Sequence, residues 1–365
     1  MRDADAAGLY LAPEGLLTGE AAIAAIAAGH AWPIAGGWTA ASLACVFERR
    51  PDGGADRLMV PVAELDAWLA VDDSPAAARL RVLAARLTTP RLDWAGLPLD
   101  RPQVMGIVNV TPDSFSDGGS HDAAPAAIAH GLKLRDAGAA ILDVGGESTR
   151  PGAAPVSVAE EIDRVVPVVH GLAAEGALVS VDTRRAEVMR AALDAGAIIL
   201  NDIQALTQPG ALDLAAKAQA PTVLMHMQGE PQTMQANPRY DMAVLDVFDW
   251  LAARIGAAEA AGLPASVLLA DPGIGFGKTL PQNLELLAGL GLYHALGVGL
   301  LLGVSRKSFI GRIDGSTVPK ERLGGSLAAA LDGIARGAQV VRVHDVAEAV
   351  QAVRVAAAIA EVQQS

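Results

Sequence analysis

The chain has 365 residues, 52% of them hydrophobic and only 4% aromatic, and it carries a formal charge of −13 with a pI near 4.9. This acidic balance argues against a general nucleic-acid or anionic-membrane surface, so any anionic ligand must be bound by local cations. The one cysteine, Cys45, cannot form an internal disulfide. Because no signal segment and no apolar run of about 18 or more residues occurs, we expect a soluble cytoplasmic protein without membrane contact.

Residues 1–88 combine Ala-rich stretches of helical character with two strand-like runs that are joined by the turn PDGG. The helical stretches and the strand-like runs are 18–29, 74–87, 42–50 and 56–60. We predict that residues 1–88 form a small α+β extension of unknown role. The segment RLDWAGLPLDRP at 91–102 then predicts a hairpin or bridge into the remainder of the chain.

From residue 104 onward the chain alternates aliphatic runs with amphipathic helical stretches. Eight such runs occur, at 104–110, 140–146, 178–183, 198–203, 222–228, 267–273, 299–306 and 340–344. Aliphatic runs with few aromatic residues are typical of parallel strands covered by helices. The pattern therefore predicts an α/β fold, a (β/α)8 barrel over residues 89–365, with a doubly wound open sheet as the alternative.

Nearly every run ends in a charged, amide or Gly residue. The polar residues at these ends are Asn109, Asp143, Asp182, Asn201, Asp271, Arg306 and His344. Helix capping explains one or two such positions but not the whole set. Because barrel active sites lie at the carboxyl ends of the strands, the set favours the barrel and an active site there. The nine residues TPDSFSDGG at 111–119 exceed the needs of a simple connection and predict a catalytic loop with the function of a lid.

The motif DPGIGFGKT at 271–279 suggests nucleotide binding, but its spacing excludes both common fingerprints. Pro272 stands where a P-loop needs Gly, and Lys278 stands where the dinucleotide motif needs its third Gly. The glycines more plausibly let the backbone approach a flat ligand. Together with Asp182 and Asn201, Asp271 offers acceptors suited to the donor edge of a guanidine-like heterocycle.

Two motifs supply cations near the last strands. SRKSFIG places Arg306, Lys307 and Ser308 before a helix, which predicts a site for an anion or carboxylate. The motif RVH puts Arg342 and His344 on one face of the eighth strand, which closes next to the strand that ends in Asn109. We expect Arg342, His344 and Asn109 to share one phosphate.

The remaining candidates have simpler interpretations. We expect His226 to be a satisfied core histidine, and Met225 and Met227 to pack, although one of the two could touch a bound ring. The seven histidines show neither His-x-His nor His-Glu-x-x-His spacing, so the sequence does not predict a histidine-ligated metal.

Seven motifs in order make the chain resemble the dihydropteroate synthase family of folate biosynthesis. They are GIVNVTPDSFSDGG, GGESTRPGA, SVDT, LMHMQG, DPGIGFGK, SRKSFIG and RVHDV. The resemblance covers roughly residues 89–365. It implies a barrel transferase that condenses 6-hydroxymethyl-7,8-dihydropterin diphosphate with 4-aminobenzoate, giving 7,8-dihydropteroate and diphosphate, and a homodimer built through barrel helices.

The resemblance also implies a role for each matching residue. The pterin would be bound by Asp182, Asn201, Met225, Asp271 and Lys307. The diphosphate would be bound by Asn109, Arg342 and His344, with Mg²⁺ bridging its oxygens to Asn109. The 4-aminobenzoate pocket would comprise Thr149, Arg150, Pro151, Phe276 and Ser308. The residues implied in catalysis itself are Asp182, Lys307, Arg342 and Asp113, the last of which would help the first loop to close.

No residue of the chain needs to act as an activated nucleophile in that reaction. Diphosphate leaves readily once its charge is neutralised, and the dihydropterin can delocalise the positive charge on its methylene carbon, so the substitution can be dissociative. Two alternatives stay open: a pterin-binding methyltransferase domain, which would not need the diphosphate motifs, and a non-catalytic pterin-binding paralogue. We also expect residues 89–365 to fold and act without the extension.

Overall fold

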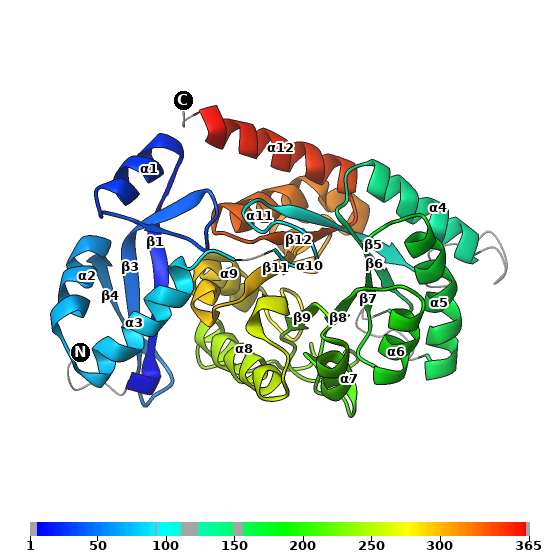
Figure 1. Cartoon of the computed structure of the whole chain (residues 1–365), viewed down its shortest axis with the longest axis horizontal. Coiled ribbons are helices and arrows are strands. Elements are labelled where there is room, and N and C mark those ends of the chain that lie inside the picture. Colours follow the sequence, from blue (N-terminus) through cyan, green and yellow to red (C-terminus); the bar gives the residue numbers. More distant parts are fainter. Residues whose placement is uncertain (1–5, 92, 111–122, 149–155, 363–365) are drawn as a thin grey trace.

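The computed structural model describes residues 6–91, 93–110, 123–148 and 156–362. A closed barrel surrounded by helices forms the larger part of the molecule, and a smaller α+β extension lies at one end of its long axis (Figure 1). The fold class expected from the sequence is therefore confirmed.

The extension is built on a four-stranded antiparallel sheet in which β3 (Thr39–Arg49) pairs with every other strand. Its other elements are β1 (Leu9–Thr18), β2 (Trp32–Pro33), β4 (Ala55–Pro61), α1 (Gly19–Ala27), α2 (Val62–Val71), α3 (Pro75–Thr88) and the 3₁₀ turn η1 (Ala6–Gly8). The expected helices and strands correspond to α1, α3, β3 and β4. The sequence pattern missed β1, because Pro13 and Gly15 interrupt it. An edge strand tolerates such residues.

The eight barrel strands each lie within one of the runs expected from the sequence or start one residue before it. They are β5 (Gln103–Asn109), β6 (Ile141–Gly145), β7 (Val179–Asp182), β8 (Ile199–Asp202), β9 (Thr222–Met225), β10 (Leu268–Asp271), β11 (Gly299–Gly303) and β12 (Val340–Val343). The surrounding helices are α4 (Ala123–Asp136), α5 (Val158–Ala174), α6 (Ala186–Asp194), α7 (Ala211–Ala218), α8 (Ala243–Ala260), α9 (Leu280–Ala288), α10 (Ser308–Asp314), α11 (Leu323–Ala335) and α12 (Val346–Val362). Short 3₁₀ helices complete the fold: η3 (Ala265–Val267), η4 (Leu290–Leu296) and η5 (Pro319–Arg322).

The last strand closes the barrel against the first. β12 pairs in parallel with β5, with Val340 beside Gln103 and Arg342 beside Met105. A doubly wound sheet is open and has two edge strands, whereas each of these eight strands pairs with a neighbour on both sides, so that alternative is wrong. Closure brings the carboxyl ends of all eight strands to one rim of the barrel.

The opposite end of the barrel is filled by the bridging segment. Trp94 is 1% exposed, exchanges backbone hydrogen bonds with Leu97, and donates its indole N–H to the carbonyl of Val267 at 2.9 Å. Positive φ angles at Ala95 and Gly96 make the tight turn between Trp94 and Leu97. This confirms the hairpin expected at 91–102 and closes the barrel core from below.

The extension and the barrel share one continuous hydrophobic core. The Tyr10 ring packs edge-on against Phe248 of α8, with ring centroids 5.6 Å apart. The Tyr10 hydroxyl donates to Asp249 at 2.7 Å, and Arg49 donates to Asp246 at the same distance. The interface therefore combines apolar packing with partly buried polar contacts, and the extension covers barrel surface that would otherwise meet water.

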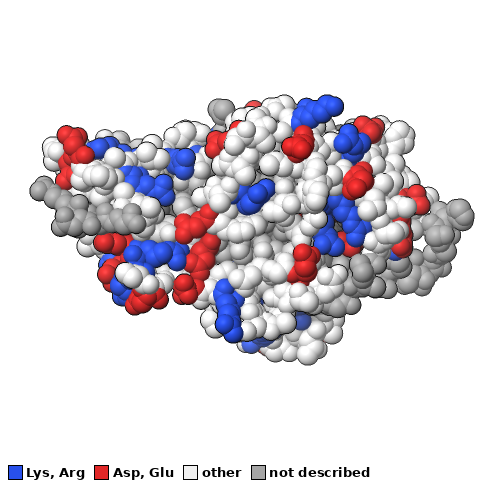
Figure 2. Space-filling model, turned by 90° about the horizontal axis from the view of Figure 1, so that it is seen from below, with Lys and Arg blue, Asp and Glu red and all other residues white. Residues whose placement is uncertain are grey.

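Figure 2 shows acidic and basic side chains interspersed on one face of the molecule, without a broad basic area. That distribution agrees with the overall acidic charge. Among the helices of the described ranges, none combines the length and the apolar character needed to cross a membrane.

Candidate active site

The candidate residues lie at the carboxyl rim of the barrel. Asn109, Asp182 and Asp271 are the last residues of β5, β7 and β10. Asp143 and Arg342 lie slightly before the ends of β6 and β12. Residues far apart in the chain therefore meet in the mouth of the barrel, as the positions at the ends of the runs predict.

Arg342 is at the centre of a network of carboxylates. Its Nε donates to Asp143 Oδ2 at 2.6 Å, and its Nη2 donates to Asp182 Oδ2 at 2.7 Å. The side-chain amide of Asn201 donates to the same Asp143 oxygen at 2.9 Å. Four strands, β6, β7, β8 and β12, thus contribute to one charged cluster.

Burial of this cluster changes the protonation of its acids. Desolvation raises the pKa of Asp182 to about 7, and the negative charge of Asp143 adds to the rise, whereas the Arg342 guanidinium opposes it. Asp182 therefore titrates near neutral pH, and its ion pair with Arg342 favours the carboxylate form.

Lys307 and Asp271 form the second half of the site. The Lys307 ammonium donates to the carbonyl of Ile274 and lies 4.8 Å from the centre of the Phe276 ring. Burial lowers the pKa of Lys307 to about 8, opposed by the charge of Asp271. Burial raises the pKa of Asp271, whose Oδ1 accepts the Gly273 N–H at 2.7 Å.

Gly303, at the end of β11, lies beside both of these groups. A Cβ atom there would lie 3.7 Å from Lys307 Nζ and 3.9 Å from Asp271 Oδ2. Both charged groups therefore lie within van der Waals distance of one position at the end of β11.

The loop that follows Asp271 is fixed by hydrogen bonds from the buried side chain of Lys278. From the sequence, this lysine had served only as evidence against a dinucleotide motif. Lys278 is 2% exposed and donates to the carbonyls of Gly273 and Phe276, each at 2.9 Å. At Gly273, with φ of 68°, a Cβ would come within 1.9 Å of the His226 carbonyl oxygen. The glycines of this motif therefore permit a close approach of two backbone segments.

His226 is a core residue, as expected. Its ring is 5% exposed, packs edge-on at 4.9 Å from the Trp250 ring, and has Nδ1 at 3.0 Å from Lys278 Nζ. Met225 and Met227 are buried in a small cluster with Ile203 and Met234, and the half-buried Phe276 packs against it. This cluster forms an apolar wall beside the polar groups of the barrel mouth.

The candidate residues of the motifs SRKSFIG and RVH lie in different surroundings. His344 Nδ1 lies 3.0 Å from Ser305 Oγ. Arg306 does not face an open anion site: it forms an ion pair with Asp345 through two guanidinium nitrogens, and its φ is 58°. Of the three residues expected at this helix start, Lys307 lies next to Asp271 in the site and Ser308 is exposed at the first position of α10.

The sequence pattern did not reveal an ion-pair network that lies beside the rim. Glu147 accepts hydrogen bonds from Arg184 at 3.3 Å and Arg185 at 2.9 Å. Arg185 also donates to the buried Glu161, which accepts the Thr183 hydroxyl at 2.6 Å. The adjacent arginines after the SVDT motif were the available signal, but only the fold brings Glu147 to them.

Some expected residues lie outside the described ranges. These are Asp113, Thr149, Arg150 and Pro151, together with the rest of the loop at 111–119. Their roles stay predictions.

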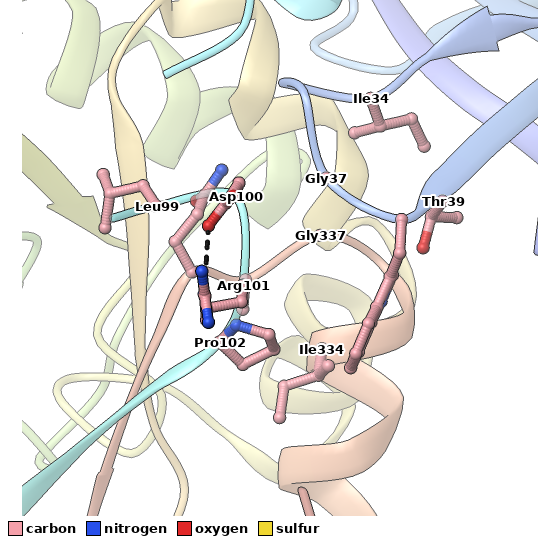
Figure 3. Close-up of a pocket in the computed structure, with 12 residues that line it drawn as sticks. Ile34, Gly37, Thr39, Leu99, Asp100, Arg101, Pro102, Ile334 and Gly337 are labelled. Atoms are coloured by element: carbon pink, nitrogen blue, oxygen red, sulfur yellow. Dashed lines mark hydrogen bonds and ion pairs between the residues drawn. The ribbon is translucent and has the colours of Figure 1, made fainter. Parts of the chain in front are cut away.

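A separate cavity of about 300 Å³ lies at the other end of the barrel, where the extension meets the starts of β5 and β12. Figure 3 shows Ile34, Gly37 and Thr39 of the extension on one side of it and residues 99–102, Ile334 and Gly337 of the barrel on the other. None of the predicted site residues lines this cavity.

The described residues contain no cluster of three or more His, Cys, Asp or Glu that could cage a metal ion. The carboxamide of Asn109 is a suitable single oxygen ligand at the rim. Mg²⁺ characteristically keeps several waters and is bound by one or two protein oxygens plus substrate phosphates. The donor set therefore fits a Mg²⁺ ion that is bound together with a phosphorylated substrate.

Residues 105–344 match the family described as "Pterin binding enzyme". The dihydropteroate synthase of Escherichia coli K12 is 51% identical over 260 residues, which cover 71% of this chain and 92% of the relative. The dihydropteroate synthase of Neisseria meningitidis serogroup B is 50% identical over 263 residues, covering 70% of this chain and 92% of the relative.

Solved structures give the same result. A Xanthomonas albilineans dihydropteroate synthase with 4-aminobenzoic acid is 54% identical with a TM-score of 0.70, and covers 74% of this chain and 98% of that chain. A Yersinia pestis dihydropteroate synthase with a sulfonamide drug is 49% identical with a TM-score of 0.70, and covers 73% and 98% of the two chains. A Xanthomonas albilineans complex with 7,8-dihydropteroate is 52% identical with a TM-score of 0.68, covering 74% and 98%.

Proposed function

Because this chain belongs to the family of pterin-binding enzymes that contains the dihydropteroate synthases, we propose that it condenses 6-hydroxymethyl-7,8-dihydropterin diphosphate with 4-aminobenzoate. The products are 7,8-dihydropteroate, diphosphate and a proton. The observation that carries this proposal is the meeting of Asp182, Asn201, Asp271, Lys307 and Arg342 at one barrel rim.

The acceptors of the site suit the pterin. A 2-amino-4-oxopterin presents a row of N–H donors, and Asp271 and Asn201 offer buried oxygens that such donors can reach. Lys307 supplies a donor for the pterin carbonyl or ring nitrogen. Met225 and the other members of the apolar cluster offer a polarisable surface to the ring face.

In the reaction, the C–O bond between the pterin methylene and the diphosphate breaks, and its electron pair leaves with the diphosphate. The amine nitrogen of 4-aminobenzoate then bonds to the methylene carbon and loses one proton. Asp182 in its carboxylate form stabilises the positive charge that develops on the dihydropterin, and Arg342 stabilises the negative charge on the leaving group.

We propose that Asn109 and His344 complete the diphosphate site and that Asn109 contributes an oxygen to Mg²⁺. The bound ion would neutralise charge on the leaving diphosphate. Phe276 and Ser308, with Thr149, Arg150 and Pro151, are proposed to bind the aminobenzoate. Asp113 and its loop are proposed to help to exclude water, which would otherwise capture the pterin cation.

We further propose a homodimer, which the family resemblance implies, and a cytoplasmic location, which the single cysteine favours. Light scattering of the purified chain would test the dimer directly, with a monomer mass contradicting it.

The activity is tested by diphosphate release. We expect release to require both substrates and Mg²⁺, and to occur in equal amount with 7,8-dihydropteroate formation measured by chromatography. Diphosphate release without the arylamine product would indicate hydrolysis and would contradict a synthase. Binding of the pterin without any release would instead support the non-catalytic alternative.

A further inference from the structure

Asp143 has no assigned role, yet it makes two of the closest contacts in the site. It is 0% exposed and lies on β6. Its Oδ2 accepts both the Arg342 Nε–H at 2.6 Å and the Asn201 amide at 2.9 Å, whereas its Oδ1 has no hydrogen-bond donor in the described part of the chain.

The barrel geometry explains why this residue reaches both partners. In the closed order, β6 lies two strands from β12 on one side and two strands from β8 on the other. Side chains from alternate strands point inward in the same layer of a (β/α)8 barrel. Asp143, Asn201 and Arg342 therefore belong to one layer, with the carboxylate between a pterin-binding residue and a diphosphate-binding residue.

We expect the contact between Arg342 and Asp182 to change when the pterin diphosphate binds. In the structure, Arg342 uses Nε and Nη2 for two carboxylates, and Asp182 Oδ2 is occupied by Arg342. A pterin that donates to Asp182 and a diphosphate that accepts from Arg342 compete with this ion pair. Something other than Asp182 must then hold the guanidinium.

We propose that Asp143 is a positioning residue that holds Arg342 and Asn201 in place while Arg342 exchanges Asp182 for the diphosphate, an inference that rests on the proposed function. Asp143 touches no reacting atom in this scheme. It acts through its two partners, and the hydrogen bond that its Oδ2 accepts keeps Arg342 on the β6 side of the barrel mouth.

Without Asp143, the only carboxylate hydrogen-bonded to Arg342 in the described structure is Asp182. A guanidinium readily forms two parallel bonds with one carboxylate, so Arg342 would engage both oxygens of Asp182. That pairing blocks the pterin acceptor and withdraws the cation from the diphosphate. Loss of Asp143 should therefore weaken binding of the pterin diphosphate and leave binding of 4-aminobenzoate unchanged.

Two substitutions separate the hydrogen bonds from the charge. Asp143→Ala removes the two hydrogen bonds and the negative charge. Asp143→Asn retains both hydrogen bonds, because both donors use Oδ2 and an amide oxygen can occupy that position, while the amide nitrogen takes the place of Oδ1.

For Asp143→Ala we expect a KM for the pterin diphosphate about 10-fold higher and a kcat/KM about 10²-fold lower, with the KM for 4-aminobenzoate within about 2-fold of the wild type. Asp143→Asn should restore most of the lost kcat/KM. Thermal melting of both variants verifies that they are folded.

The pH profile supplies an independent readout. Besides Arg342 and Asp143, the charged groups around Asp182 are Glu161 and Asp202. Removing one neighbouring negative charge makes Asp182 easier to ionise, so the acidic limb of kcat/KM should move to lower pH in Asp143→Asn. Glu161→Gln is the matched control, because it removes a buried charge near Asp182 but leaves the contacts of Arg342 and Asn201. Glu161→Gln should move the acidic limb of kcat/KM to lower pH as well, without raising the KM for the pterin diphosphate.

A folded Asp143→Ala variant with an unchanged KM for the pterin diphosphate overturns the inference, as does an Asp143→Asn variant as defective as Asp143→Ala. If the wild type releases no diphosphate, the proposed function fails, but the positioning role is still measured by calorimetric titration with inorganic diphosphate. We expect affinity for inorganic diphosphate to fall about 10-fold in Asp143→Ala, and equal affinity in the two proteins would reject the role.

Discussion

At the scale of single residues, the site depends on charges whose protonation is set by burial. Asp182 illustrates this, because desolvation raises its pKa to about 7 although Arg342 is 2.7 Å away. Lys307 is affected in the opposite direction, with a pKa of about 8. Both values lie near physiological pH, so small changes in the surroundings of these residues should have large effects on the fraction in the active form.

For Asp182→Asn we expect kcat to fall by about 10²-fold or more, because the amide is isosteric but cannot stabilise the developing cation. In the wild type the active form is the carboxylate. The kcat/KM should therefore be lost as pH falls through about 7, and Asp182→Asn should lack this limb. Steady-state kinetics from pH 5.5 to 9 measure both effects, and a wild-type profile that stays flat down to pH 5.5 would contradict the assignment.

The proposed aminobenzoate pocket gives a second residue-scale prediction. Sulfonamides resemble 4-aminobenzoate in shape, and Phe276, which we propose as part of the aminobenzoate pocket, has its ring centre 4.8 Å from Lys307 Nζ. We expect a sulfonamide to inhibit competitively with 4-aminobenzoate, and Phe276→Ala to weaken binding of both. Inhibition that persists at saturating 4-aminobenzoate would place the sulfonamide elsewhere.

At the scale of elements, the loop after β10 links two lysines through its backbone carbonyl groups. Lys278 donates to backbone carbonyls of this loop, and the same loop supplies the Ile274 carbonyl to Lys307. The orientation of Lys307 thus depends on a loop that is itself held by a second lysine.

Lys278→Met should therefore destabilise the protein by about 1–3 kcal/mol, since it leaves buried carbonyl groups without a donor. It should also raise the KM for the pterin diphosphate, because the loop directly follows Asp271 and supplies the Ile274 carbonyl that accepts a hydrogen bond from Lys307. Urea unfolding and kinetics measure the two effects. The control is Lys217→Met on the exposed face of α7, where we expect a change within about 0.5 kcal/mol. Equal stability of the two variants would show that Lys278 does not hold the loop.

At the scale of the whole molecule, the extension is part of the same hydrophobic core as the barrel. β1 and α3 pack on the 3₁₀ helix η4, whose residues Leu292 and Tyr293 are 1% and 0% exposed. This contact changes our expectation for the barrel alone, because its removal exposes apolar surface that the isolated pattern of strands did not reveal.

We expect a chain of residues 89–365 to retain every described site residue but to melt at least about 10 °C below the full chain, at about 2–4 °C per kcal/mol lost, and to aggregate more readily. Circular dichroism and diphosphate release of the truncated chain test this. Full-length Tyr10→Phe, which removes only the hydroxyl that donates to Asp249 and accepts from Arg49, should lose a few degrees at most. A truncated chain with the same melting temperature as the full chain would show that the extension contributes no stability.

The sequence by itself determined the barrel and the location of its active site. The eight aliphatic runs contain the strands, because strand formation depends on the local pattern of apolar residues. The polar residues at their ends identify the rim with the active site, because the chain direction of parallel strands brings all their carboxyl ends to one end of the barrel. Motif spacing likewise excluded a nucleotide site at 271–279.

Only the tertiary structure decided which of these side chains pair with one another. Arg342 and Asp143 are 199 positions apart in the sequence, so no local pattern shows that they share a hydrogen bond. The same holds for Arg306, which the motif placed in an anion site but which the fold pairs with Asp345, and for the contact between Tyr10 and Asp249. The contact between Arg342 and Asp143 depends on closure of the barrel, because closure places β12 two strands from β6, whereas the contact between Tyr10 and Asp249 depends on the packing of the extension against α8.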